Sequence, residues 1–253
     1  MRFLSISALA VAFAVSVPGL ASAQWGGIKG QVVLDGALPK LPDLVQKGNA
    51  AAKDAAVCAV NGVPDEKIIV DADSKGISNV VIYLRKKPAK IHPELAKPKE
   101  ATLTYDQVGC RFIPHILVVQ SGQTINVLNG DAVSHNTRNA PVKNPGFNFI
   151  VAPNNRGGVP VNNQKLAETV PMPISCDIHP WMRGYWVMVD HPYAVVTGKD
   201  GKFELENLPE GENEFRVWHE GPGYIEQSLK VTVKNGSVAE VPVIKVKAAD
   251  LNK

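Results

Sequence analysis

FIPHILVVQSGQTINVL, residues 112–128, gives the clearest indication of the fold class. It contains two short runs rich in apolar and β-branched residues, 116–120 and 124–128, on either side of a Ser-Gly turn. Apolar and polar residues alternate in the second run, which is typical of a strand with one buried face. The stretch therefore predicts two consecutive strands joined by a tight turn.

The same pattern continues in both directions along the chain. The sequence has 21 Gly and 19 Pro in 253 residues, so turn signals recur at short intervals. Helical periodicity is nearly absent, and only residues 43–60 could hold a helix. We therefore expect an all-β protein built from β-sandwiches. Its other strand-like runs are 27–34, 79–84, 185–189, 203–205, 214–218 and 229–233.

Composition shifts divide the chain after a leader segment into three parts. Residues 24–75 form an N-terminal β segment, 76–190 a central sandwich, and 191–253 a second, small β-sandwich. A lone strand in the N-terminal segment cannot bury a core. Pairing with the last unit is therefore the alternative to folding on its own.

Residues 1–23 have the pattern of a secretory signal peptide. Arg2 gives a positive start, an apolar run follows, and Ala21-Ser22-Ala23 offers a cleavage site. A retained membrane anchor is the alternative, but the run is short and contains Pro18. We expect a periplasmic or secreted protein without a membrane span. The net charge of +3 and the interspersed charges do not indicate a nucleic-acid binder.

The chain has three cysteines, Cys58, Cys110 and Cys176. In an exported protein, an odd number leaves one cysteine over or pairs it with another chain. We expect a disulfide between Cys58 and Cys110, which would close a loop of about fifty residues. Cys176 would then be a free thiol, and metal ligation would explain it.

The segment SCDIHPWMRG, residues 175–184, carries the chemistry. It places Cys176, His179 and Met182 at steps of three residues. A thiolate, an imidazole and a thioether form a soft ligand set that suits copper, and blue-copper sites add a second imidazole. His135 is the best candidate for that second imidazole, because it follows the strand pair and a short polar loop.

Several other interpretations compete with a copper site. A helical stripe would give the same spacing, but Pro180 interrupts it. Covalently attached haem would need C-x-x-C-H, which the sequence lacks, and zinc gains little from a thioether. In the simplest alternative, Cys176 and Met182 only fill the core. His115 is either a buried imidazole, a fifth ligand or a bridge to a second metal.

Two segments resemble the cupredoxin family of blue copper proteins. CDIHPWMRGYWVMV, residues 176–189, resembles the ligand loop of small cupredoxins of the amicyanin type, and residues 112–136 resemble the strand pair before the first ligand. The resemblance implies a cupredoxin-type Greek-key β-sandwich and one type 1 copper ion. It also implies that Asn136 ties the two ligand loops together by hydrogen bonds. The implied copper ligands are His135, Cys176, His179 and Met182.

A second resemblance covers residues 197–220, TGKDGKFELENLPEGENEFRVWHE. They resemble the carboxypeptidase-regulatory or transthyretin-like β-sandwich, which implies a structural or partner-binding unit. The whole arrangement resembles exported bacterial cupredoxin proteins of the methylamine-utilisation type. The long linker 139–173 departs from the small cupredoxins and could form an insertion over the copper.

These expectations lead to an electron carrier rather than an enzyme. Its partners would be redox proteins such as a cytochrome or a dehydrogenase. The alternative is a non-catalytic binding or scaffold module for a carbohydrate or a protein, with structural copper or none. A third reading, a copper enzyme with an open site, depends on His115 and the linker 139–173. The sequence contains no G-x-S-x-G elbow and no Gly-rich phosphate loop.

Overall fold

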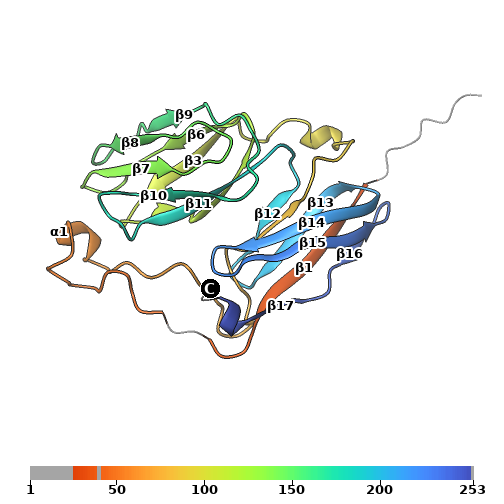
Figure 1. Cartoon of the computed structure of the whole chain (residues 1–253), viewed down its shortest axis with the longest axis horizontal. Coiled ribbons are helices and arrows are strands. Elements are labelled where there is room, and N and C mark those ends of the chain that lie inside the picture. Colours follow the sequence, from red (N-terminus) through yellow and green to blue (C-terminus); the bar gives the residue numbers. More distant parts are fainter. Residues whose placement is uncertain (1–24, 39–40, 252–253) are drawn as a thin grey trace, which may run out of the picture.

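The protein is built almost entirely from β-strands. The computed structural model describes residues 25–38 and 41–251, so the expected signal peptide, 1–23, lies outside the described residues. These residues contain seventeen strands, one four-residue α-helix and two 3-10 turns, which confirms the all-β prediction. Among them, no helix is long and apolar enough to cross a membrane. Figure 1 shows two sandwiches side by side.

The first sandwich consists of two sheets from the middle of the chain. One sheet has the strand order β5-β11-β10-β7-β8 and the other the order β4-β3-β6-β9. In the first sheet, β5 and β11 are parallel and the other neighbours are antiparallel. The strands are β3 (Thr102–Gln107), β4 (Phe112–Ile113), β5 (Ile116–Gln120), β6 (Thr124–Val127), β7 (His135–Asn139), β8 (Asn148–Val151), β9 (Val159–Val161), β10 (Met172–Ser175) and β11 (Arg183–Val189).

The core of this sandwich follows from the alternation of the strands. In β6, Ile125 and Val127 are fully buried while the polar residues between and before them are not. β11 is apolar almost throughout because both of its faces are covered. Trp186 packs in the core of the first sandwich, whereas Val187 packs in a separate apolar cluster toward the second sandwich.

The second sandwich combines both ends of the described chain. One sheet has the order β13-β1-β16, with β17 also on β1, and the other has the order β12-β2-β14-β15. Its core holds Ile28 from β1, Ile82 from β2 and Phe215 from β14. The strands are β1 (Trp25–Asp35), β2 (Val81–Leu84), β12 (Ala194–Val196), β13 (Lys202–Pro209), β14 (Gly211–His219), β15 (Gly223–Val233), β16 (Val238–Glu240) and β17 (Ile244–Lys247). The 3-10 turns are η1 (Pro93–Leu95) and η2 (Ala248–Asp250).

The observed strand pairing differs in one strand from the expected central sandwich of residues 76–190. Of the two alternatives for the first strand, the structure has the pairing with the last unit, because β1 pairs with β13, β16 and β17. β2 lies within 76–190, the range expected for the central sandwich, yet it pairs with β12 and β14. All four residues of β2 are buried. One face of the strand packs in the core of the second sandwich, and the other face packs in the apolar cluster between the two sandwiches.

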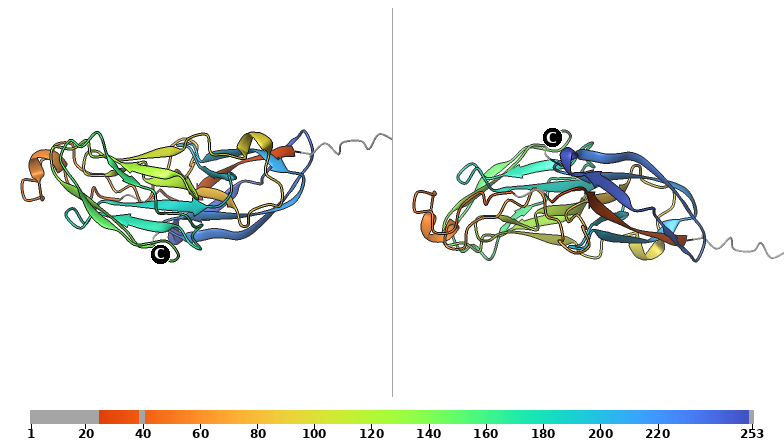
Figure 2. Two further views of the ribbon diagram at one scale, coloured as in Figure 1. Left: turned by 90° about the horizontal axis from the view of Figure 1, so that it is seen from above. Right: turned by 90° about the horizontal axis from the view of Figure 1, so that it is seen from below.

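An apolar interface joins the two sandwiches. Tyr83 and Trp218 of the second sandwich share one cluster with Ile116, Val187 and Val189 of the first. The Tyr185 and Trp218 rings lie with their centroids 5.0 Å apart. The two sandwiches therefore form one elongated body, as the two views in Figure 2 show.

A long excursion between β1 and β2 reaches the far end of the first sandwich. It carries the helix α1 (Ala55–Cys58), seen in orange in Figure 1. The predicted disulfide between Cys58 and Cys110 is present and joins residues 52 positions apart. Cys176 is left as a buried free thiol. The disulfide thus fixes the α1 segment against the end of the first sandwich.

We expect the disulfide to contribute substantially to stability. Replacing both Cys58 and Cys110 by Ser should lower the free energy of unfolding by roughly 4 kcal/mol, because the open chain gains loop entropy. Urea denaturation followed by tryptophan fluorescence measures this loss. The exposed pair Lys230→Ala and Glu212→Ala serves as a control, since a surface ion pair contributes about 0–1 kcal/mol. A loss below 1 kcal/mol for the cysteine variant would contradict the prediction.

Candidate metal centre

Three strands of the first sandwich bring the predicted ligands to one end of a sheet. β10 ends at Ser175, directly before Cys176, and β11 begins at Arg183, directly after Met182. β10 pairs antiparallel with both β11 and β7, and β7 begins at His135. Backbone hydrogen bonds therefore hold the start of β7 and the loop 176–182 at the same end of the sheet.

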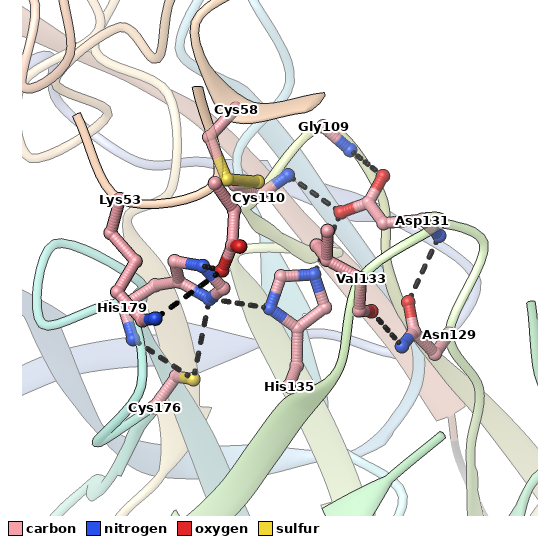
Figure 3. The surroundings of a disulfide bond; sticks show 11 residues. Lys53, Cys58, Gly109, Cys110, Asn129, Asp131, Val133, His135, Cys176 and His179 are labelled. Atoms are coloured by element: carbon pink, nitrogen blue, oxygen red, sulfur yellow. Dashed lines mark hydrogen bonds and ion pairs between the residues drawn. A yellow bond between two sulfur atoms is a disulfide. The ribbon is translucent and has the colours of Figure 1, made fainter. Parts of the chain in front are cut away.

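His135, Cys176 and His179 form a compact and buried group. Each residue offers a ligand atom, and these atoms all lie within 4.8 Å of one another. The two Nδ1 atoms are 2.9 Å apart, and the Cys176 Sγ lies 4.0 Å from the His179 Nδ1. Both imidazole side chains have no exposed surface. Figure 3 shows the three side chains pointing toward one another, which is an arrangement that could hold a metal ion.

The surroundings of Cys176 favour its thiolate form. Burial alone would raise the pKa of the thiol, but the adjoining side chains of His135 and His179 and the backbone N–H groups of Asn136 and His179 lower the pKa to about 6. The two backbone donors are each 3.4 Å from the sulfur. The thiolate is the form of cysteine that binds metals.

Each of the two imidazoles has a carboxylate on its other ring nitrogen. The His135 Nε2 lies 2.8 Å from an oxygen of Asp131, and the His179 Nε2 lies 2.9 Å from an oxygen of Asp54. The backbone N–H groups of Gly109 and Cys110 donate to the Asp131 carboxylate (Figure 3). A carboxylate in this position fixes the tautomer, so that Nδ1 presents a lone pair to the centre.

Asn136 connects the strand that begins at His135 to the loop of Cys176. Its Oδ1 accepts the backbone N–H groups of Asp177 and Ile178, at 2.7 and 3.1 Å, and lies 3.2 Å from the Cys176 sulfur. Its Nδ2 donates to the side-chain oxygen of Asn148 in β8, at 2.8 Å. Asn136 is itself buried, so these bonds hold the two ligand loops in a fixed relation.

Met182 closes the loop. Its N–H donates to the His179 carbonyl, at 2.9 Å, and its carbonyl accepts the Cys176 N–H, at 3.3 Å. The side chain is buried and packs in the same core cluster as Cys176. Trp181 lies beside it, with its ring centroid 5.2 Å from that of His179. The role of Met182 as an axial ligand remains a prediction.

Sequence reasoning missed the two carboxylates of the centre. Asp131 lies only four residues before His135, so spacing gives a weak signal for it. Asp54 is 125 positions from His179, and its neighbours in the sequence give no signal at all. The disulfide at Cys58 brings the Asp54 segment to the site. His115, weighed as a further ligand, lies outside the group of three and contacts other residues.

Comparison with known proteins gives a partial likeness. No family model matches the sequence, and no curated protein matches it. Among solved structures, the chain is similar to a Cu-containing nitrite reductase from Thermus scotoductus, with 20% identity, coverage of 41% of this chain and 25% of that chain, and a TM-score of 0.29. The match therefore spans a quarter of the nitrite reductase.

Two smaller structures are matched over most of their own length. A purple cupredoxin from Nitrosopumilus maritimus shows 18% identity, covers 34% of this chain and 99% of that chain, and has a TM-score of 0.28. Amicyanin from Paracoccus versutus shows 17% identity, with coverages of 49% and 92% and a TM-score of 0.24. These TM-scores are too low to assign a family, so the fold class rests on the strand pairing described above.

The hydrogen bonds of Asn136 lead to a stability prediction that needs no metal. Asn136→Ala should lower the free energy of unfolding of the metal-free protein by about 1–3 kcal/mol, because the N–H groups of Asp177 and Ile178 lose their buried acceptor. Chemical denaturation measures the change. Asn126→Ala is the matched control, since its side chain makes one exposed bond, to the Gly157 carbonyl. Equal effects of the two substitutions would contradict the role of Asn136.

Proposed function

We propose that this chain is an exported protein that binds one type 1 copper ion and carries single electrons between redox partners. The observation that carries the proposal is the group of His135, Cys176 and His179, which are buried together at one end of the sheet. One ligand atom of each residue, a ring nitrogen or the sulfur, lies within 4.8 Å of the other two. Little rearrangement is needed for all three to bind one ion.

The chemistry of the donors fits copper better than zinc. Two imidazoles and one thiolate with a weak axial thioether are the ligand set of blue-copper sites. Structural zinc sites take four tightly bound ligands, usually thiolates and imidazoles, and gain little from the Met182 thioether. Bound copper would supply one-electron chemistry by alternating between Cu(I) and Cu(II).

The residues of this chain would keep the ligands still during electron transfer. Asp131 and Asp54 orient the two imidazole rings, and Asn136 fixes the loop that carries Cys176. The side chains of His135, Cys176 and His179 are buried, so the fold excludes water from the ligand atoms. A fixed, dry ligand set costs little reorganisation when the charge of the centre changes by one, which favours an electron carrier over an enzyme with an open metal position.

The rest of the proposal follows from this role. A carrier needs a protein that delivers electrons and one that accepts them, such as a cytochrome or a dehydrogenase. The disulfide between Cys58 and Cys110 is consistent with an oxidising compartment such as the periplasm. In the rival proposal, the sandwiches form a binding module in which copper is structural or absent.

The first test is spectroscopic. The copper-loaded, oxidised protein should show an intense blue band and a narrow copper hyperfine splitting in electron paramagnetic resonance. Cys176→Ser should abolish the band, because the band arises from charge transfer between the thiolate and copper. Ser175→Ala, which changes the neighbouring hydroxyl, should retain it. A colourless wild-type protein, or a band that survives in Cys176→Ser, would reject the copper assignment.

Met182 is tested by the reduction potential. Met182→Gln should lower the potential, because an axial oxygen donor is harder than a thioether and stabilises Cu(II). Met182→Leu, which keeps the volume but has no donor atom, should raise it. Protein-film or solution voltammetry measures both variants. If both potentials equal that of the wild type, Met182 is not a ligand.

A further inference from the structure

A second cluster of ionisable residues lies where the two sandwiches and the excursion before β2 meet. A cavity of about 430 Å³ opens there. Its walls come from several separate parts of the chain, among them residues 63–67 of the excursion, Arg111 and His115, the segment that follows His179, and Glu220. Among its lining residues, His115, Glu66 and Glu220 form a chain of contacts.

One ring nitrogen of His115 has a hydrogen-bond partner, and the other has none in the described part of the chain. Its side chain is only 9% exposed. The Nε2 forms a short hydrogen bond with the carboxylate of Glu220, which is itself 8% exposed. The Nδ1 is buried and has no hydrogen-bond partner among residues 25–38 and 41–251. The Oε2 of Glu66 lies 3.9 Å from the Nδ1.

This separation is too long for a hydrogen bond and about half an ångström longer than that of two ligands on one tetrahedral metal ion. A hydrogen bond between nitrogen and oxygen spans about 2.7–3.2 Å, so 3.9 Å is too long for one. Imidazole nitrogen and carboxylate oxygen each lie about 2.0–2.2 Å from a bound Zn²⁺. At a tetrahedral angle, two such bonds place the nitrogen and the oxygen about 3.4 Å apart, so the two side chains would close by about half an ångström around the ion.

The groups behind these two atoms complete the pattern. Glu220 on the His115 Nε2 is the carboxylate that commonly orients a metal-binding imidazole. Arg111 holds the Oε1 of Glu66 at 3.0 Å, which leaves the Oε2 free to face the Nδ1. The cavity supplies the space for water or a further ligand in the remaining positions.

His219 is close to this cluster but does not belong to the ligand set. Its Nδ1 accepts the N–H of Gly221, at 3.1 Å, so the Nε2 must carry the proton. Burial of the ring is the largest cause that lowers the pKa of His219, to about 4. The ring is therefore neutral at physiological pH, with no lone pair facing away from Gly221.

We propose that His115 Nδ1 and Glu66 Oε2 bind a second metal ion, a divalent first-row ion of the Zn²⁺ class, with Glu220 orienting the imidazole. An imidazole with a carboxylate and without a thiolate selects such an ion rather than Cu(I). Met182 and Trp181 line the same cavity, so the ion lies on the Met182 side of the first centre. The proposal does not depend on copper in that centre.

The rival explanation is a protonated His115 held between two glutamates. Burial opposes the charge, but the hydrogen bond of Glu220 and the charges of Glu220, Glu66 and Asp65 raise the pKa of His115. In that case the proton on Nδ1 would occupy the position of the metal, and added Zn²⁺ would not bind with a defined stoichiometry.

The test is a calorimetric titration of the copper-loaded full chain with Zn²⁺. We expect one Zn²⁺ per chain, while the blue band stays constant because copper keeps the first centre. Glu66→Gln and His115→Ala should each weaken Zn²⁺ binding at least tenfold. Glu212→Gln, which makes the same chemical change on an exposed side chain, should bind Zn²⁺ like the wild type.

Two results would overturn the proposal. One is the absence of stoichiometric Zn²⁺ binding in the wild type, and the other is wild-type affinity for Zn²⁺ in both Glu66→Gln and His115→Ala. Circular dichroism identifies a variant that fails to fold, and Glu66→Gln preserves the shape of the side chain. If Zn²⁺ bleaches the blue band, the ion has entered the first centre. If the blue band is never seen, the copper proposal fails, while the loss of a Zn²⁺ site in Glu66→Gln is still measurable.

Discussion

The structure depends on the backbone hydrogen bonds that pair β10 with both β7 and β11. This pairing places the start of β7 beside the loop that joins β10 to β11. His135 and Cys176 thus meet although they are more than forty residues apart in the sequence. Because the sheet fixes the backbone on both sides, the linker 139–173 can be long without moving the ligands, and part of it forms β8, β9 and β10.

Around this pairing, the protein adds a layer of buried polar contacts. Unpaired buried charges are costly, and each of the two buried imidazoles has a carboxylate partner. Asp131 is held by two backbone N–H groups, and Asn136 accepts two others. Asp54 is held in place by a segment that a disulfide fixes to the sandwich. The α1 excursion therefore contributes to the centre, although its own secondary structure is minimal.

The second sandwich extends this scheme through its interface. It covers the outer face of β11, the strand that follows the ligand loop, and it delivers Glu220 to His115. Its first strand, β1, leads into the excursion that carries both Asp54 and Glu66. The two sandwiches are therefore interdependent: each metal-binding group proposed here needs residues that the other part of the chain positions.

Four features could be predicted from the sequence: the all-β class, the motif around Cys176, the candidate His135 and the disulfide partners. These features depend on short-range periodicity, on residue chemistry and on the odd number of cysteines, all of which can be read locally. Three others became visible only in the folded chain: β2 belongs to the second sandwich, Asp54 contacts His179, and Glu220 contacts His115. The last two contacts join residues 125 and 105 positions apart. Such contacts depend on strand order and on how the sandwiches pack, and no local pattern in the sequence encodes these.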